Sequence, residues 1–258
     1  MTKTIVLIHG AWVNPESWSG FIERYETRGY RCIAPAWPYD DRPVGELRAT
    51  PDPRLAAIGI GEIVDHYDRI VRGLDRPILI GHSFGGLFVQ MLLDRGLGAA
   101  GVSIDPAPPK GILPGPNAVR ASLPVLMGWQ SWSRIRTMPF ESFQWGWVHT
   151  LDRAAQRAAY DRYVVPTPGR IFLQALLAPF TNVIKVNFGN AKRAPLLIIA
   201  GELDRTVEAR MNRANFHAYR SSAVTELREF RGRTHWIINQ PGWEEVADHA
   251  IEWTARHS

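Results

Sequence analysis

Apolar runs alternate with amphipathic stretches along most of this chain. Six runs are short and rich in apolar, often β-branched residues, as expected of strands: Ile5–His9, Arg31–Pro35, Ile78–Gly81, Gly101–Asp105, Leu196–Gly201 and Val224–Phe230. Helical patterns lie between the early strands. Because strands that alternate with helices are joined by crossover connections, the pattern predicts the α/β class: a mostly parallel sheet of about six strands flanked by helices.

Three helices can be placed from their ends and their apolar faces. Asn14 suits the N-cap of the first helix, Pro15 its first position and Gly29 its end. A second helix and the C-terminal helix, which begins near Pro241, each carry an apolar stripe at helical spacing. The two stripes contain Ile63, Val64, Tyr67, Ile70, Val71 and Leu74, and Trp243, Val246, Ala247, Ala250 and Ile251.

One interval, residues 106–194, is much longer than a simple crossover requires. Short helices separated by prolines are expected there, for example over Arg153–Val164 and Arg170–Ala178. We therefore divide the chain into a core, residues 1–105 and 195–258, and a helical insertion, residues 106–194, placed before the penultimate strand. The insertion is also rich in aromatic residues, among them Trp129, Trp132, Trp145 and Trp147.

Composition and charge narrow the classes of protein. Hydrophobic residues make up 45% of the 258 residues, enough for one substantial core, and the net charge is +5. The basic residues are scattered arginines without a run, so no nucleic-acid partner is expected. Cys32 is the only cysteine, within an apolar run that predicts a buried strand position, and nothing indicates an oxidising compartment. With no leader and no apolar stretch of membrane-spanning length, we expect a cytoplasmic protein without a membrane partner.

The most specific motif is Gly81-His82-Ser83-Phe84-Gly85, followed by Gly86. It lies between the strand-like Ile78–Gly81 and a helix-like stretch from Leu87. A Gly-x-Ser-x-Gly string between a strand and a helix is typical of a nucleophile elbow, in which a sharp turn exposes the serine hydroxyl. Glycines remove side chains where such a turn is most crowded. The motif therefore indicates that Ser83 is a nucleophile.

Two later segments supply an acid and a base. Asp204 follows an apolar run that ends at Gly201, and His235 follows the strand Val224–Phe230. Serine, acid and histidine in this order are typical of the α/β-hydrolase fold. With these motifs the chain resembles the α/β-hydrolase superfamily from end to end, as a small serine hydrolase or esterase with a cap insertion. The resemblance implies a catalytic triad of Ser83, His235 and Asp204.

Other residues compete for two of these roles. Glu202 precedes Asp204 in the same loop, and Asp105 ends the preceding strand, where some family members carry their acid. Asp204 is preferred because its spacing after Gly201 and before His235 fits best. The competing histidines are less favourably placed: His9, His66, His82, His217, His249 and His257. Thr234 occupies a position where the family often has glycine, so the family pattern does not determine the backbone conformation there.

The resemblance also implies an oxyanion hole and a substrate pocket. In similar enzymes the loop after a His-Gly pair, here His9-Gly10, supplies one backbone N–H group, and the residue after the nucleophile supplies the other. By position these donors are Ala11 and Phe84. In related hydrolases an insertion at this place covers the nucleophile, so we call residues 106–194 the cap segment. Substrate contacts are expected from Trp12, Trp129, Trp132, Trp145 and Trp147.

These features predict a cytoplasmic serine hydrolase that cleaves a carboxylic ester, lactone or thioester of a small apolar substrate through an acyl-enzyme. Two alternatives stay open: a lyase or C–C bond hydrolase with the same triad, and a low-turnover ligand-binding protein on this fold. Gly10 stands where plant hydroxynitrile lyases carry threonine. No metal constellation or dinucleotide fingerprint is found, so we expect no cofactor and a small molecule as the partner. The sequence identifies neither the physiological substrate, with its acyl size and stereochemistry, nor the oligomeric state.

Overall fold

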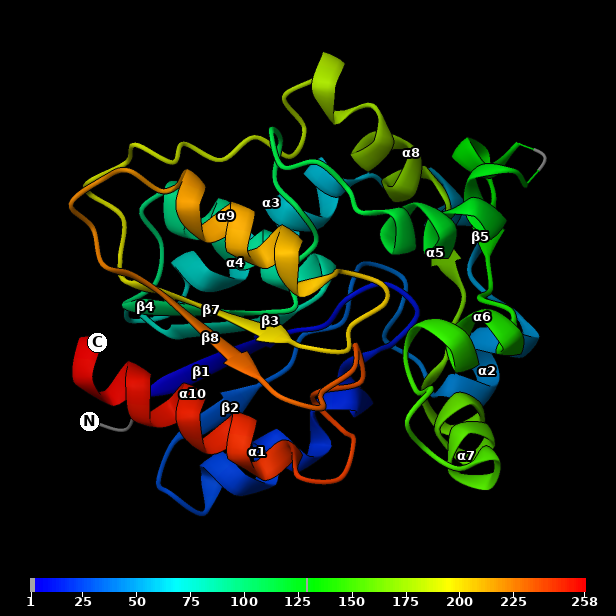
Figure 1. Ribbon diagram of the computed structural model, residues 1–258, viewed down its shortest axis with the longest axis horizontal. Coiled ribbons are helices and arrows are strands. Elements are labelled where there is room, and N and C mark those ends of the chain that lie inside the picture. Colours follow the sequence, from blue (N-terminus) through cyan, green and yellow to red (C-terminus); the bar gives the residue numbers. More distant parts are fainter. Residues whose placement is uncertain (1–2, 129) are drawn as a thin grey trace.

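The computed structural model describes residues 3–128 and 130–258, and its centre is a six-stranded sheet with the strand order β2-β1-β3-β4-β7-β8 (Figure 1). Every neighbouring pair of strands is parallel. The prediction of a mostly parallel sheet is therefore confirmed, and the observed strand ends differ from the predicted ones by at most two residues. The strands are β1 (Thr4–Ile8), β2 (Arg31–Ile33), β3 (Ile78–His82), β4 (Ala100–Ile104), β7 (Leu196–Gly201) and β8 (Thr225–Phe230).

Helices cover both faces of this sheet. One face carries α1 (Ser19–Glu26) and α10 (Trp243–His257), and the other carries α3 (Ile60–Arg72), α4 (Phe84–Asp94) and α9 (Ala209–Ala218) (Figure 1). Successive side chains of a strand point to opposite faces. Ile5 and Leu7 of β1 accordingly join the apolar cluster under α1 and α10, whereas Val6 and Ile8 join the cluster on the other face. Burial on both faces explains why the four inner strands are almost entirely apolar, whereas the edge strand β8 alternates buried and exposed positions and carries charged residues.

The predicted helix signals act as expected. Asn14 Oδ1 accepts a hydrogen bond from the Glu16 N–H at 3.1 Å, and Pro15 begins a 3-10 turn (Pro15–Trp18) that leads into α1. Gly29 has a φ of 83°, the left-handed conformation that ends many helices. In the described part of the chain, no helix is both long and apolar enough to cross a membrane. Cys32 lies in β2 but is only half-buried, not buried as predicted.

Most of the cap segment lies beyond the carboxyl ends of the central strands, and its last residues return to the amino end of β7 (Figure 1). Its helices α7 (Arg153–Tyr163) and α8 (Arg170–Leu176) confirm the two helices predicted there. The separation of the chain into two domains stays a prediction. The remaining elements of the segment are α5 (Pro116–Leu126), a 3-10 turn (Ser131–Ser133), the antiparallel pair β5 (Ile135–Arg136) and β6 (Thr167–Pro168), α6 (Phe140–Gly146) and a 3-10 turn (Ala178–Phe180).

A second region packs against the cap segment, and sequence analysis did not foresee it. It contains α2 (Val44–Ala49) and a 3-10 turn (Pro53–Ala57), between β2 and α3. The Arg48 guanidinium donates to the Val164 carbonyl at 2.6 Å and to the Asp161 carbonyl at 2.9 Å, at the end of α7. This arginine therefore ties the core to the cap segment at a helix C-terminus, where a cation is favourable.

Candidate active site

Ser83 stands at the sharp turn between β3 and α4, with a φ of 57° and a ψ of −121°. Its N–H donates to the Ile104 carbonyl at 2.9 Å, and its own carbonyl accepts from the Ala107 N–H at 3.0 Å. The turn is possible only with glycines beside it. A Cβ on Gly81 would lie 2.2 Å from the Gly85 carbonyl oxygen, and a Cβ on Gly85 would lie 2.0 Å from the Ile8 carbonyl oxygen. The backbone therefore has the strained geometry that a nucleophile elbow requires.

Asp204 and His235 form a buried pair at the same end of the sheet. Asp204 follows β7, His235 follows β8, and His235 Nδ1 lies 2.6 Å from Asp204 Oδ2. Asp204 Oδ1 accepts from the N–H groups of Thr206 and Val207 at 2.6 and 2.8 Å. Burial lowers the pKa of His235 to about 3, so the imidazole is neutral at pH 7 and can accept a proton.

The loop that carries His235 is held by polar contacts from both sides. The N–H and the hydroxyl of Thr234 both donate to Gln240 Oε1, at 2.7 and 2.9 Å. His82 Nε2 donates to the His235 carbonyl at 2.9 Å. Thr234 thus replaces the usual glycine without disturbing the site, because its hydroxyl is fully used. No sequence motif pointed to Gln240.

Ser83 and His235 lie at the same end of the sheet, but no hydrogen bond joins them in the described structure. The rings of His82, the neighbour of Ser83, and His235 have centroids 4.7 Å apart. His235 Nε2 is buried, and no described residue forms a hydrogen bond with it. Gly10 lies directly against the serine, since a Cβ there would be 2.7 Å from Ser83 Cβ and 3.3 Å from Ser83 Oγ. The nitrogen that a serine proton would reach is therefore unoccupied by any competing partner in the described structure.

The two residues expected to supply the oxyanion hole follow Ser83 and Gly10 in the chain. Phe84 is the first residue of α4, where backbone N–H groups have no partner within the helix. Ala11 follows Gly10 and is buried. The role of both residues as donors to an oxyanion stays a prediction.

Aromatic side chains pack around the residues beside Ser83, and Ser83 itself is only 6% exposed. Phe172 of α8 stacks on Trp12 with a centroid distance of 5.1 Å and meets Phe84 edge-on at 5.4 Å. Trp147, which follows α6, meets the His235 ring edge-on at 4.6 Å. Residues from the cap segment therefore touch the elbow, the loop after β1 and the histidine. Phe172 was not among the predicted site residues, and only its place in an aromatic-rich insertion could have suggested it.

The other predicted tryptophans lie elsewhere. Trp132 is 55% exposed, and Trp145 is covered on its face by the Arg120 guanidinium at 4.1 Å. Trp129 lies outside the described residues. Trp12 and Trp147 thus contact residues around the serine and histidine, whereas Trp132 is exposed and Trp145 packs against Arg120 and Arg205. Contact with substrate stays a prediction for all five.

The two competing acids differ in position. Glu202 is exposed, and its carboxylate accepts from the Gly232 N–H at 2.9 Å, outside the site. Asp105 is fully buried beside the Asp204–His235 pair. Among the described residues, His82, Asp105 and His235 present possible metal-ligand atoms within 4.8 Å of one another. His235 already contacts Asp204, so a metal here would have to compete with that hydrogen bond.

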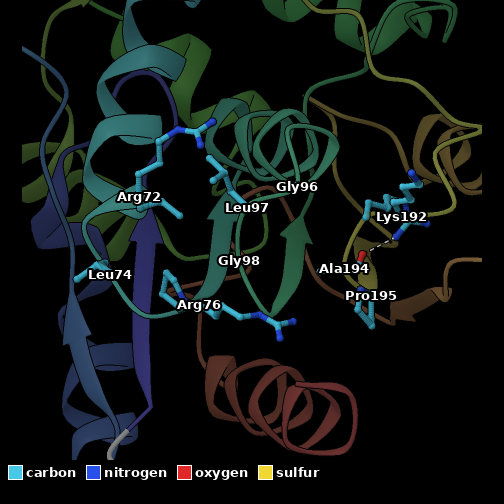
Figure 2. A pocket seen from close by; sticks show the side chains of 12 residues that line it. Arg72, Leu74, Arg76, Gly96, Leu97, Gly98, Lys192, Ala194 and Pro195 are labelled. Carbon is cyan, nitrogen blue, oxygen red and sulfur yellow. Dashed lines mark hydrogen bonds between the residues drawn. The ribbon is translucent and has the colours of Figure 1, made fainter.

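Two cavities of the described structure have no Ser83 in their lining. The larger, about 660 Å³, lies at the amino ends of the strands, the opposite end of the sheet (Figure 2). Arg72, Arg76 and Lys192 line it and point in different directions, and no predicted site residue reaches it. The smaller, about 340 Å³, opens beside Asp204 and is lined by His149 and Arg205.

Comparisons with known proteins agree with this geometry. A family model described as the alpha/beta hydrolase family matches residues 5–249. Three solved structures are similar over nearly their whole length. A monoacylglycerol lipase from Paleococcus ferrophilus has a TM-score of 0.72 and 20% identity, covering 100% of this chain and 96% of that chain. A methylesterase from Arabidopsis has a TM-score of 0.71 and 13% identity, covering 98% and 99%.

The third structure is a mutant of tomato methylketone synthase I, with a TM-score of 0.71 and 13% identity, covering 100% of both chains. At these identities the likeness concerns the fold alone. No curated protein sequence matched the chain.

Proposed function

The chain belongs to the alpha/beta hydrolase family, and on this basis we propose that it is a serine hydrolase acting on carboxylic esters, lactones or thioesters of small apolar acyl groups. Ser83 is the nucleophile, His235 the general base and acid, and Asp204 the residue that orients the imidazole. The observation that carries the proposal is the buried His235–Asp204 contact of 2.6 Å, next to a serine at a strained elbow.

The reaction proceeds in two steps. Ser83 Oγ attacks the acyl carbonyl while His235 Nε2 takes its proton, and the proton then passes to the departing alcohol or thiol. A water molecule attacks the acyl-enzyme by the same route and releases the acid. The N–H groups of Ala11 and Phe84 stabilise the oxyanion in both steps, and the ionised Asp204 stabilises the imidazolium.

An apolar substrate is favoured by the surroundings of Ser83. Trp12, Phe84, Phe172 and Trp147 present aromatic surface around the serine and histidine. A closed apolar site excludes water and favours acyl groups that fill it. The lipase and the methylesterase among the similar structures are named for ester hydrolysis, which supports this class of reaction. A methylketone synthase on the same fold keeps another reaction open as an outcome of the test.

A panel of short and medium acyl esters, lactones and thioesters tests the proposal. Each is assayed before and after treatment with an alkyl fluorophosphonate, which reacts with activated serines. We expect ester hydrolysis that the phosphonate abolishes, and a single adduct on the peptide that contains Ser83, measured by mass spectrometry. An unlabelled Ser83, or labelling without any acyl hydrolysis, would contradict the proposed activity. A cytoplasmic location and a small-molecule partner stay predictions.

A further inference from the structure

A second carboxyl group, that of Asp105, lies beside the proposed triad without a role in it. Asp105 follows β4 with a φ of 41°, in the left-handed region that non-glycine residues seldom adopt. Its side chain is completely buried. Oδ1 accepts from the Gly201 N–H at 2.7 Å, and no described N–H or O–H group donates to Oδ2. The backbone therefore directs a carboxyl group into a dry site and satisfies only one of its oxygens.

The groups that face Asp105 come from three neighbouring elements. His82 ends β3, Asp204 follows β7, and His235 follows β8. Possible ligand atoms of Asp105, His82 and His235 lie within 4.8 Å of one another. The carboxyl groups of Asp105 and Asp204 are in hydrogen-bonding contact. Glu208 adds a further negative charge near Asp204. None of these groups is a cation. An ionised Asp105 would therefore lie beside the negative charge of Asp204 with no positive charge among them to offset it.

The numbers of hydrogen-bond donors distinguish the two carboxyl groups. Asp204 accepts from the N–H groups of Thr206 and Val207 and contacts His235 Nδ1. Asp105 accepts from the Gly201 N–H only. Donors favour the ionised form of a carboxyl group, and two carboxyl groups in contact cannot both ionise easily. The better-supplied Asp204 is therefore the anion, and the shared proton belongs to Asp105.

His82 lies near Asp105, but no hydrogen bond joins the two side chains in the described structure. Its Nε2 donates to the His235 carbonyl, which makes Nδ1 the acceptor nitrogen of the neutral ring. No hydrogen bond links Nδ1 to a described residue. Besides the Gly201 N–H, the hydrogen-bonding contact of the Asp105 side chain is with the Asp204 carboxyl group.

We propose that Asp105 is a neutral carboxylic acid that donates a hydrogen bond from Oδ2 to the Asp204 carboxylate and so holds that carboxylate in place for His235. Burial raises the pKa of Asp105 well above its usual value, and the charge of Asp204 raises it further. Burial also raises the pKa of Asp204, but the N–H groups of Val207 and Thr206 lower it. Asp105 is thus a positioning residue, and its kinetic effect rests on the proposed function.

Asparagine separates this role from that of an ionised acid. In Asp105→Asn the amide oxygen can still accept from Gly201, and the NH₂ group can still donate to Asp204, so the variant reproduces the neutral acid. Asp204→Asn, the comparison variant, removes the anion that His235 needs. We expect Asp105→Asn to keep most of the kcat of the wild type, and Asp204→Asn to lose about 10⁴-fold, as replacing a triad aspartate by asparagine does elsewhere. Asp105→Ala, which cannot donate, should lower kcat with little change in KM.

An infrared measurement tests the proton itself and does not depend on activity. The difference spectrum between the wild type and Asp105→Asn at pH 7 should contain the carbonyl stretch of a protonated carboxylic acid, which shifts in D₂O. Circular dichroism and thermal melting establish that the variants fold, and Asp105→Asn decides the question if Asp105→Ala does not fold.

The possible outcomes separate the two proposals. Absence of the protonated band, or a loss of kcat in Asp105→Asn as large as in Asp204→Asn, would overturn the role of Asp105. A protonated band in a protein without acyl hydrolysis would support the shared proton and contradict the proposed function.

Discussion

At the scale of single residues, Ser83 carries the sharpest prediction. Ser83→Ala removes the nucleophile but leaves a side chain that fits the same backbone, so we expect the fold to persist. Loss of a triad serine lowers turnover by roughly 10⁶-fold in a well-studied protease, and a fall of this order in kcat for an ester is expected here. Ser19→Ala, at an exposed helix start, is the matched control and should retain wild-type kcat. Ester turnover that persists in pure Ser83→Ala protein would assign the nucleophile elsewhere.

His9 provides a residue-scale prediction about pH and stability. It is buried, its Nδ1 donates to the Gly10 carbonyl at 2.9 Å, and its Nε2 accepts from the Trp37 N–H at 3.2 Å, so the ring is neutral. Burial lowers its pKa to about 4, below the value of about 6.5 in an unfolded chain. Between these values the unfolded state binds the extra proton, so the free energy of unfolding falls as pH falls, by about 1.4 kcal/mol per pH unit from this residue.

The measurement compares denaturant unfolding of the wild type and His9→Gln between pH 7 and pH 4. Glutamine cannot take up the proton, so the slope of the unfolding free energy against pH should be shallower in the variant by about that amount. Equal slopes for the two proteins would show that His9 does not titrate between the folded and unfolded states in this range.

At the scale of elements, we predict that the cap segment selects the acyl groups that react at Ser83. Trp147 contacts His235 from this segment, whereas Trp132 is 55% exposed on its outer side. We expect Trp147→Ala to change the ratio of kcat/KM between bulky and short esters by at least about tenfold, because filling or emptying an apolar pocket changes transition-state binding by about 1–3 kcal/mol. Trp132→Ala is the matched control and should leave the ratio unchanged. If both variants fold and keep the wild-type ratio, Trp147 supports the histidine loop without shaping the pocket.

At the scale of the whole molecule, one carboxylate joins α1, early in the chain, to α10, late in the chain. Asp248 of α10 binds Arg24 of α1 through two hydrogen bonds, of 2.5 and 2.6 Å, and Arg28 at 2.5 Å. Arg24, which has the larger influence, and Arg28 lower the pKa of Asp248 in the folded protein. These ion pairs therefore stabilise the fold fully above the pKa that Asp248 has in the unfolded chain. The stabilisation is lost as the pH falls through the pKa of Asp248 in the folded protein. We expect Asp248→Asn to cost about 1 kcal/mol at pH 7 and low salt, and less at high salt.

Asp65→Asn is the control for this network, because Asp65 is 64% exposed and binds only the exposed Arg95. Its cost in denaturant unfolding should be close to zero and lower than that of Asp248→Asn. Equal costs for the two variants would show that the network between α1 and α10 adds nothing beyond an ordinary surface pair.

The sequence by itself determined the six strands, their parallel arrangement and the turn at Ser83. These features depend on short-range patterns: runs of apolar residues for strands buried on both faces, and glycines where Gly81 and Gly85 meet neighbouring backbone. The chain order of Ser83, Asp204 and His235 could also be predicted, since each residue follows a recognisable strand. The region around α2 escaped prediction because its partner, the end of α7, is more than a hundred residues away in the chain.

Only the tertiary structure decided how the polar groups of the site meet. Asp204, Glu202 and Asp105 were all candidates in the sequence, and their distances to His235 follow from how β4, β7 and β8 end side by side. The contacts of Gln240 with Thr234 and of Phe172 with Trp12 have no local signature. Hydrogen bonding and burial at such points depend on elements distant in the chain. The sequence therefore specified the residues available for chemistry, and packing determined which of them meet.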